Sequence, residues 1–373
     1  MADAVKIIRY LIITFAAIAI GLTIITFLFM QQKSFGKLPS GKRLERIKNS
    51  PNYRDGSFQN VIPTEMVAEG VSYPKMMIDF FSKGANREPA VTLPSIKTDL
   101  KTLPEEPSII WFGHSSYLIT VNGKNILVDP VFSERASPVQ YLGSKNYQIQ
   151  TPFSMDDFPP IDLVVISHDH YDHLDYNTIL KLKPMTKLFC VGLGVGSHLE
   201  HWGVGESQIR EFDWWEGDTV LPGIELISTP ARHFSGRGFK RFQTLWTSFV
   251  LKIGGFNIFI GGDSGYDASF RKIGEKYGPF NLVMLECGQY DKQWPFIHMM
   301  PEETTQASID LQSAVLLPVH WGKFTLALHP WDEPIKRAVA SAEELNVQLT
   351  TPLIGERLRL DSITGGSRWW EFK

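Results

Sequence analysis

The chain has 373 residues and 43% hydrophobic residues, enough for one large domain or two smaller ones. Its formal net charge of −3 argues against a polyanion-binding protein, so we do not expect nucleic acid as a partner. Cys190 and Cys287 are the only cysteines. Each lies in an apolar run, which favours buried free thiols over a disulfide or thiolate ligands.

Residues 1–32 predict a membrane anchor. Tyr10–Met30 carries no charge over about 20 positions, the length that an α-helix needs to cross a bilayer. A cleaved signal peptide is the alternative, but the run does not end in the small residues that such a cleavage site has. Basic residues flank the run on both sides, as far as Lys48. The positive-inside rule weakly places the globular part in the cytoplasm, but the downstream charges could also meet anionic headgroups, so the side stays open.

Residues 33–105 predict an irregular extension that packs on the main domain. The segment is rich in Pro, Gly, Ser and charge, but its aromatic and methionine side chains argue against disorder. It could offer acyl chains an apolar groove, or it could simply pack against the main domain. The side chains that could form the groove are Tyr73, Met76, Met77, Phe80 and Phe81.

Residues 106–373 predict one domain of alternating strands and helices. Residues 108–121 and 124–132 are β-rich runs joined by an Asn-Gly turn, and residues 161–167 form a short buried strand. Residues 173–184 predict a helix that ends at Pro184. The same alternation continues to a strand that ends near His320. Such a pattern indicates sheets covered by helices, with polar clusters where strands end.

The stretch His168-Asp169-His170-Tyr171-Asp172-His173 has the pattern HxHxDH. Alternate residues of an extended loop project to the same side, so His168 and His170 can grip one metal ion. Asp172 and His173 can face a second ion where the chain turns into the helix. Neutral imidazole and carboxylate suit zinc, with manganese or iron as alternatives.

Three further candidate ligands follow strands later in the chain: His233, Asp263 and His320. Two glycines precede Asp263 and allow the backbone to approach the site. The seven side chains allow one metal on His168, His170 and His233. A second metal would then lie on Asp172, His173 and His320, with Asp263 as the bridge between the two.

This arrangement resembles the metallo-β-lactamase superfamily, and within it the N-acylphosphatidylethanolamine-hydrolysing phospholipase D group and its bacterial relatives. The matching segments lie within residues 36–360 and are "WFGHSSYLI", "SHDHYDHLD", "FDWWEGD", "TPARHF", "GGDSGYD", "HMMPEE" and "VHWGKFTLALHPWDEP". The resemblance implies an αββα sandwich of two mixed sheets with two zinc ions at one edge. Together with the anchor, it implies a single-pass protein of the bacterial inner membrane.

The resemblance also implies an activity, the hydrolysis of a phosphodiester bond in N-acylphosphatidylethanolamine or a related phospholipid. Asp172 would orient the attacking water and accept its proton, besides acting as a ligand. His298 matches a family histidine and would hold the phosphate or protonate the leaving oxygen. A lactonase, a hydrolase of soluble phosphodiesters and a non-catalytic metal-stabilised membrane protein are the alternatives. The native lipid, the metal in the cell and a homodimeric state are left open.

The remaining histidines give weaker indications. His114 is equally compatible with a place beside the metals and with a hydrogen bond at a strand end. His198 and His201 have a spacing that could bind metal, but we expect them on a helix surface because seven ligands already fill two sites. His329 could line the pocket, and its sequence context does not decide this.

Overall fold

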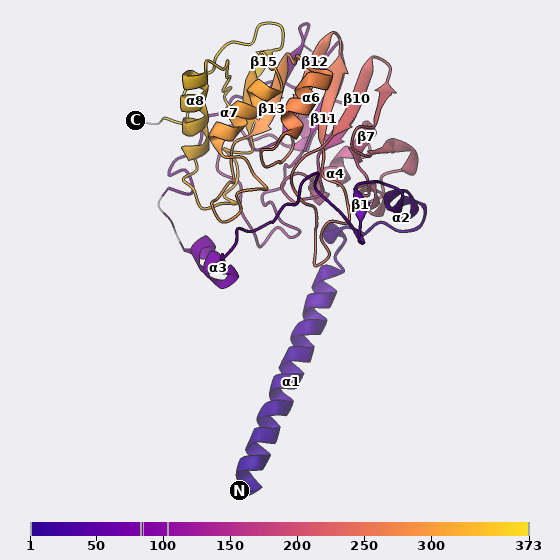
Figure 1. The fold of residues 1–373 in the computed structure, drawn as a ribbon, viewed down its shortest axis with the longest axis vertical. Coiled ribbons are helices and arrows are strands. Elements are labelled where there is room, and N and C mark those ends of the chain that lie inside the picture. The colour runs from indigo at the N-terminus through magenta and orange to yellow at the C-terminus, as the bar shows by residue number, and fades with distance from the viewer. Residues whose placement is uncertain (1, 83, 85, 103, 372–373) are drawn as a thin grey trace.

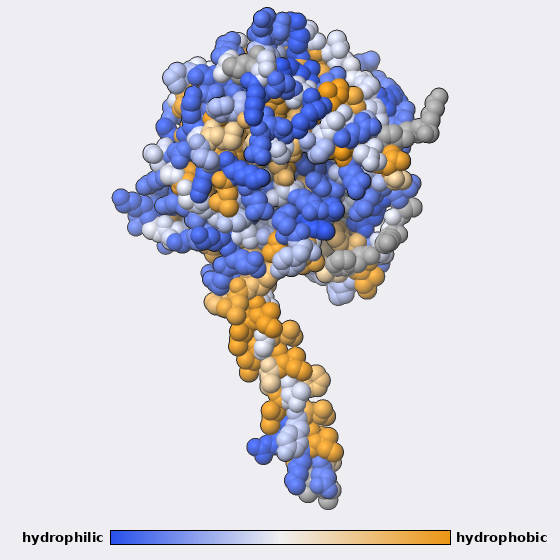
Figure 2. Space-filling model, turned by 180° about the vertical axis from the view of Figure 1, so that it is seen from behind, coloured by the Kyte–Doolittle hydropathy of each residue, from blue (hydrophilic) through white to orange (hydrophobic). Residues whose placement is uncertain are grey.

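The structure is a computed structural model that describes residues 2–82, 84, 86–102 and 104–371 (Figure 1). Its first element is the 29-residue helix α1 (Ala2–Met30), which projects from the globular part. The portion Asp3–Met30 is long and apolar enough to cross a membrane, and none of it is buried inside the protein. Figure 2 shows apolar side chains along most of α1, whereas the visible face of the globular part is mostly hydrophilic. The helix is therefore a candidate membrane span, as the sequence predicts.

Two sheets form the globular part. The first has seven strands, in which β5 to β8 are parallel neighbours and the other pairs are antiparallel. In spatial order its strands are β15 (Arg357–Arg359), β3 (Ser108–Trp111), β4 (Tyr117–Val121), β5 (Lys124–Val128), β6 (Ile161–Ile166), β7 (Thr186–Gly192) and β8 (Ile209–Phe212). The first predicted β-rich run is thus two strands, separated by the turn that contains His114.

The second sheet has six strands, of which β12, β13 and β14 are parallel neighbours. In spatial order they are β14 (Leu316–Val319), β13 (Leu282–Glu286), β12 (Phe256–Ile260), β11 (Ser248–Ile253), β10 (Ile224–Thr229) and β9 (Gly217–Leu221). Both sheets are therefore mixed. Mixed sheets with parallel strands need helical cover on their outer faces.

Helices supply that cover. The largest core cluster joins the inner faces of the two sheets, for example Val165 of β6 with Leu251 of β11. A second cluster packs α4 (Tyr176–Leu182) and α5 (Gly196–His201) on the outer face of the seven-stranded sheet. A third cluster packs α6 (Ser269–Tyr277) and α7 (Pro301–Asp310) on the six-stranded sheet. The predicted αββα sandwich is confirmed, with α8 (Glu333–Leu345) beside α7.

The predicted helix at residues 173–184 is shorter in the structure, where α4 starts at Tyr176. The Asp175 side chain accepts a hydrogen bond from the Asn177 backbone N–H, which caps the first turn. The helix therefore begins after Asp175, and the residues before it form a loop. That loop carries the HxHxDH residues.

The N-terminal extension is more regular than the sequence predicts. It contains α2 (Gly41–Lys48), a two-stranded hairpin of β1 (Tyr53–Arg54) and β2 (Ser57–Phe58), and α3 (Tyr73–Phe81). Ile47 and Phe58 are buried in a small core with Trp214 and Trp246 of the main domain. In α3, by contrast, Tyr73, Met77 and Ile78 are exposed.

Candidate metal centre

The predicted site residues meet at one edge of the sandwich because each follows the end of a strand. His168–His173 follow β6, and His233, Asp263 and His320 follow β10, β12 and β14. At the approach to Asp263, a Cβ atom on Gly262 would lie 2.8 Å from Ser167 Cβ, and Gly262 has a φ of +61°. Glycine thus allows the end of β12 to pass directly beside the end of β6, as predicted.

One group of side chains consists of His168, His170, His233 and Asp263, whose ligand atoms all lie within 4.8 Å of one another. His170 Nδ1 is 2.9 Å from His168 Nε2 and 3.2 Å from His233 Nε2. Asp263 Oδ2 lies 3.8 Å from each of those two Nε2 atoms. Three imidazole nitrogens and a carboxylate oxygen around one point could hold a metal ion.

A second group consists of Asp172, His173, His320 and His114, again within 4.8 Å of one another. Asp172 Oδ2 lies 2.8 Å from His114 Nε2, 3.5 Å from His173 Nε2 and 4.0 Å from His320 Nε2. Three members are predicted ligands of the second metal. His114, whose role the sequence left open, is the fourth.

Asp263 connects the two groups. Its Oδ2 is 3.1 Å from His173 Nε2, and its Oδ1 is 3.2 Å from His320 Nδ1. The same carboxylate is therefore close to histidines of both groups, which is the place that the sequence predicts for a bridging ligand.

Neighbouring groups orient the histidines. His173 Nδ1 donates to Asp129 Oδ2 at 2.8 Å, and His233 Nδ1 donates to the Ile297 carbonyl at 2.7 Å. With Nδ1 held in this way, Nε2 of each ring points into the cluster, where its lone pair could bind a metal ion. Partners of this kind commonly fix the tautomer of metal-binding histidines.

The donor set fits metal ions. His173 Nε2 and Asp263 Oδ1 are buried and make no hydrogen bond, although each has a site atom within 3.2 Å. Buried polar atoms without partners are costly in proteins, and a cation between them would satisfy both. All the predicted ligands except His170 and Asp172 are at most 3% exposed. Enclosed imidazole and carboxylate donors of this kind suit zinc.

Burial sets the protonation states of the cluster. It lowers the pKa of His168, His233 and His320 well below the ordinary value, and that of His170 to about 4, so these rings are neutral. Burial opposes the charge of Asp172, but His173 and the hydrogen bond from His114 hold the pKa of that carboxyl well below its usual range. His173 and Asp263 differ from the other members. Burial opposes the charge of His173, but Asp263, Asp172 and Asp129 raise the pKa of its ring well above the ordinary value, and burial raises the pKa of Asp263 to about 7. Neutral imidazole and ionised carboxylate are the forms that bind metal, so a cation would have to displace the second ring proton of His173.

His298, the predicted catalytic histidine, lies beside the cluster and pairs with Glu286. Its Nδ1 is 2.6 Å from Glu286 Oε2, and its ring stacks on His320 with centroids 5.3 Å apart. Glu286 is the last residue of β13 and is fully buried, and its other oxygen accepts the Ser264 backbone N–H. The His298 side chain is 13% exposed and that of Asp172 is 14% exposed, whereas that of His320 is nearly enclosed. His298 and Asp172 are therefore among the more accessible polar groups of the site.

The sequence interpretation missed or misplaced several residues. It missed Asp129 and Glu286, both of which are charged residues at the end of an apolar strand. The expectation that His198 lies on a helix surface is wrong, because the ring is 2% exposed and its Nε2 donates to Asp169 Oδ2 at 3.2 Å. His201 is exposed, as predicted. His329 accepts the Gln289 backbone N–H and is not part of either histidine group.

Comparison with known proteins agrees with this geometry. The Beta-lactamase superfamily domain family matches residues 124–321. An uncharacterized protein of Mycobacterium tuberculosis is 40% identical over 332 residues, 87% of this chain and 88% of its own. An N-acyl-phosphatidylethanolamine-hydrolyzing phospholipase D of Caenorhabditis elegans is 31% identical over 254 residues, 63% of this chain and 70% of its own.

Two further similarities concern a short relative and the fold. Outer membrane protein RomA of Klebsiella pneumoniae is 53% identical over 94 residues, 25% of this chain and 71% of its own. The structure of an isothiocyanate hydrolase from Delia radicum gut bacteria superposes with a TM-score of 0.54 at 18% identity, over 69% of this chain and 99% of that one. At this identity the structural similarity concerns the fold alone.

Proposed function

Because the chain belongs to the metallo-β-lactamase superfamily, we propose that it is a membrane-anchored phosphodiesterase with two zinc ions that hydrolyses a phospholipid in the manner of a phospholipase D. The substrate class is N-acylphosphatidylethanolamine or a related phospholipid. The position of Asp263 between two histidine groups carries the proposal, since a carboxylate shared in this way suits a dinuclear centre. The similarity to the nematode phospholipase D supports the choice of substrate.

His168, His170 and His233 would hold one ion, and Asp172, His173 and His320 the other, with Asp263 shared. His114 reaches Asp172 Oδ2 at 2.8 Å and would orient that carboxylate. When bound, such ions act as Lewis acids and lower the pKa of a water.

The protein's own residues would move the protons. Asp172 is ionised and partly accessible, so it can accept a proton from the attacking water. The water oxygen forms a bond to phosphorus while the bond from phosphorus to the ethanolamine oxygen breaks. Burial raises the pKa of the Glu286 carboxyl well above its usual range and lowers that of His298, so a protonated Glu286 would donate to Nδ1 of the neutral ring. Nε2–H would then give its proton to the leaving oxygen while Nδ1 takes the proton of Glu286. The products are phosphatidic acid and an N-acylethanolamine.

The proposal places α1 in the membrane, with the bacterial inner membrane as its location. A single span would keep the site next to the bilayer in which its substrate resides. The exposed apolar side chains of α3 support this placement, because α3 lies at the same end of the globular part as α1 (Figure 1).

Oxygen-18 labelling tests the reaction. The full-length, zinc-loaded protein is incubated with N-acylphosphatidylethanolamine in mixed micelles made with labelled water, and the products are followed by mass spectrometry. We expect the label in phosphatidic acid, loss of turnover with a chelator, and a loss on the order of 10²-fold or more in Asp263→Asn. Asp156→Asn removes an exposed acid that has no role here and is the matched control.

Two outcomes would contradict the proposal. Label in the N-acylethanolamine would show cleavage on the carbon side of the leaving oxygen. Turnover of a lactone or a soluble phosphodiester, with no turnover of any phospholipid by the same preparation, would replace the lipid by a soluble substrate.

A further inference from the structure

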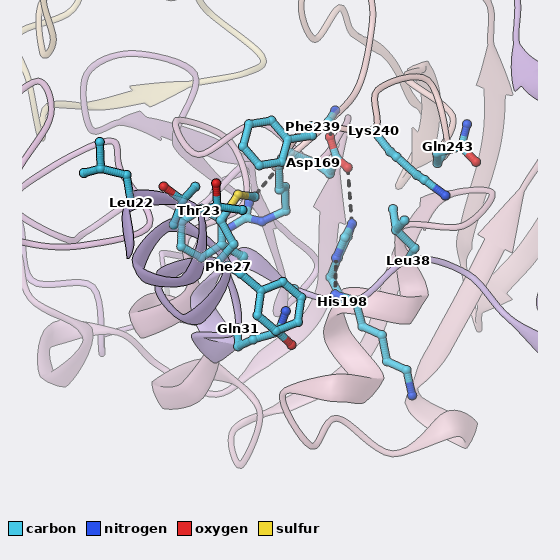
Figure 3. Close-up of a pocket in the computed structure, with 18 residues that line it drawn as sticks. Leu22, Thr23, Phe27, Gln31, Leu38, Asp169, His198, Phe239, Lys240 and Gln243 are labelled. Carbon is cyan, nitrogen blue, oxygen red and sulfur yellow. Dashed lines mark hydrogen bonds and ion pairs between the residues drawn. The ribbon is translucent and has the colours of Figure 1, made fainter. Parts of the chain in front are cut away.

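A crevice of about 770 Å³ lies between the C-terminal half of α1 and the globular part (Figure 3). One side is formed by Gln31 and by the α1 residues Leu22, Thr23, Thr26, Phe27 and Met30. Leu38 and the loop at Gly236–Lys240 form other sides. Figure 3 shows the α1 side chains on one side, Lys240 and Gln243 on the other, and Asp169 and His198 between them. None of the seven candidate metal ligands lines this space, so the crevice is separate from the metal centre.

The lining has an apolar part that is continuous with the candidate membrane span. Phe27 and Met30 of α1 belong to it, together with Phe35 after the helix and Phe239 in the facing loop. Phe239 is 83% exposed, which is unfavourable in water but favourable against acyl chains. The apolar side of the crevice therefore suits a hydrocarbon chain that lies along α1.

The polar part is positively charged. Lys37, Arg237 and Lys240 line it, and Asp169 is the one carboxylate among the described lining residues. Asp169 is already occupied, because its oxygens accept hydrogen bonds from the Gly236 N–H, Thr244 Oγ1 and His198 Nε2.

The two lysines have no such compensation. Among the described residues, neither Lys37 Nζ nor Lys240 Nζ has a carboxylate within ion-pair distance. Arg237 is different, because it is buried over the rings of Tyr171 and Trp202 and near the Asp169 carboxylate. Its hydrogen bonds go to the carbonyl oxygens of Asp169, Leu174 and Ser34, and its Nε has no hydrogen-bond partner among the described residues. An anionic group would neutralise this excess of positive charge.

We propose that the crevice binds one phospholipid as a resident lipid, with its phosphate near Lys37 and Lys240 and one acyl chain along α1. The proposal uses the membrane placement of α1 but not the proposed reaction. The lipid is distinct from the lipid that is hydrolysed, since the crevice meets the HxHxDH loop at Asp169, whose side chain is bonded away from the histidine groups.

Native mass spectrometry tests the proposal on the full chain, purified in detergent, stripped of lipid and titrated with dioleoylphosphatidylglycerol. We expect one lipid per wild-type chain. The double variant Lys37→Glu with Lys240→Glu should bind on the order of 10-fold or more weakly, because two charges near the phosphate are reversed. The control, Lys181→Glu with Lys272→Glu, changes the net charge equally at exposed positions of α4 and α6 and should bind as the wild type does.

Two other variants make the result decisive. Thr26→Trp enlarges a lining side chain on the exposed surface of α1 and should also exclude the lipid, even if the lysine variant does not fold. Asp172→Asn should leave lipid binding unchanged. The proposal is overturned if the lysine variant and Thr26→Trp both bind the lipid as the wild type does, or if dioleoylglycerol, which lacks the phosphate, binds equally well. It is also overturned if Asp172→Asn alone abolishes lipid binding, because the lipid would then occupy the metal centre. Failure of the labelling experiment with intact retention would overturn the reaction and leave the crevice site standing.

Discussion

The replacement of Asp129 by Asn tests how strongly a residue that is not itself a candidate ligand controls the metal centre. Asp129 Oδ1 accepts the Ser167 backbone N–H at 2.8 Å, and Oδ2 accepts Ser167 Oγ and His173 Nδ1–H. In the Asp129→Asn variant the amide oxygen must keep the backbone N–H, so the amide NH₂ faces His173 Nδ1. That nitrogen must then accept, and the ring proton moves to Nε2.

The expected magnitude follows from this tautomer change. Nε2 is the His173 nitrogen that lies 3.1 Å from Asp263 and 3.5 Å from Asp172, so the variant loses the lone pair that faces the cluster. Removal of such a partner typically lowers metal affinity 10- to 100-fold, which is about 1.4 to 2.7 kcal/mol. Because the substitution disfavours the binding tautomer and does not merely loosen the ring, we expect a loss near 100-fold.

The assay is elemental analysis of protein equilibrated with a series of zinc buffers of known free concentration. One of the two ions should be lost at a free zinc concentration about 100-fold higher than in the wild type, and the other should shift less. Asp162→Asn is the matched control, since Asp162 is a buried carboxylate on β6 that accepts the Asn125 backbone N–H at 3.0 Å. Wild-type zinc affinity in the Asp129 variant, or an equal loss in the Asp162 variant, would refute the reasoning.

Three further predictions follow from other parts of the structure. His298→Ala should keep its metal content but lose turnover on the order of 10²-fold, and the loss should shrink for a nitrophenyl phosphodiester, whose leaving group needs little protonation; an equal loss on both substrates would instead indicate phosphate positioning. Deletion of residues 1–32 should release a folded protein from membranes. Deletion of residues 1–38 also removes the backbone groups of Lys33, Ser34 and Lys37 that hydrogen-bond to Trp202, Arg237, Ser197 and His198, and should lower the free energy of unfolding in urea titrations by at least a further ~1.5–3 kcal/mol. Burial lowers the pKa of Lys323 to about 7, so its charged form is disfavoured in the folded protein; this cost is fully present below pH 7 and is relieved as the pH rises toward the ordinary lysine value of 10.5. Lys323→Met should therefore stabilise the protein more at pH 6 than at pH 9, and an equal gain at both values would contradict the assignment.

The part of the site that could be predicted is the part that local rules determine. HxHxDH places its ligands on one short loop, and His233, Asp263 and His320 directly follow strands. Parallel strands of a sandwich end at a common edge, so residues after them converge even when they are far apart in the sequence. For the same reason the alternating strands and helices were sufficient to predict two covered sheets.

The residues that were missed depend on pairings between distant segments. Asp129 directly follows β5, and Glu286 is the last residue of β13. Their sequence context does not reveal that β5 pairs with β6, or that the chain brings His298 into contact with Glu286. His114 stands in a left-handed turn with a φ of 53°, and its backbone N–H donates to the carbonyl of Trp321, which lies just after β14 of the other sheet. Such a position is set by the meeting of two sheets, which no single segment specifies.

The error at His198 has the same origin, because a distant segment next to α1 covers this histidine. The spacing of His198 and His201 on a short helix predicts a surface, and it would be one if residues 33–38 did not cover it. There the Lys37 N–H donates to His198 Nδ1, Ser197 Oγ donates to the Lys37 carbonyl, and Trp202 Nε1 donates to the Lys33 carbonyl. Because buried polar groups are costly without these partners, the end of α1 cannot shift on the domain without exposing or orphaning them. These contacts therefore hold the segment that follows α1 on the globular part. In the proposed membrane placement of α1, they would also orient the candidate metal centre relative to the bilayer.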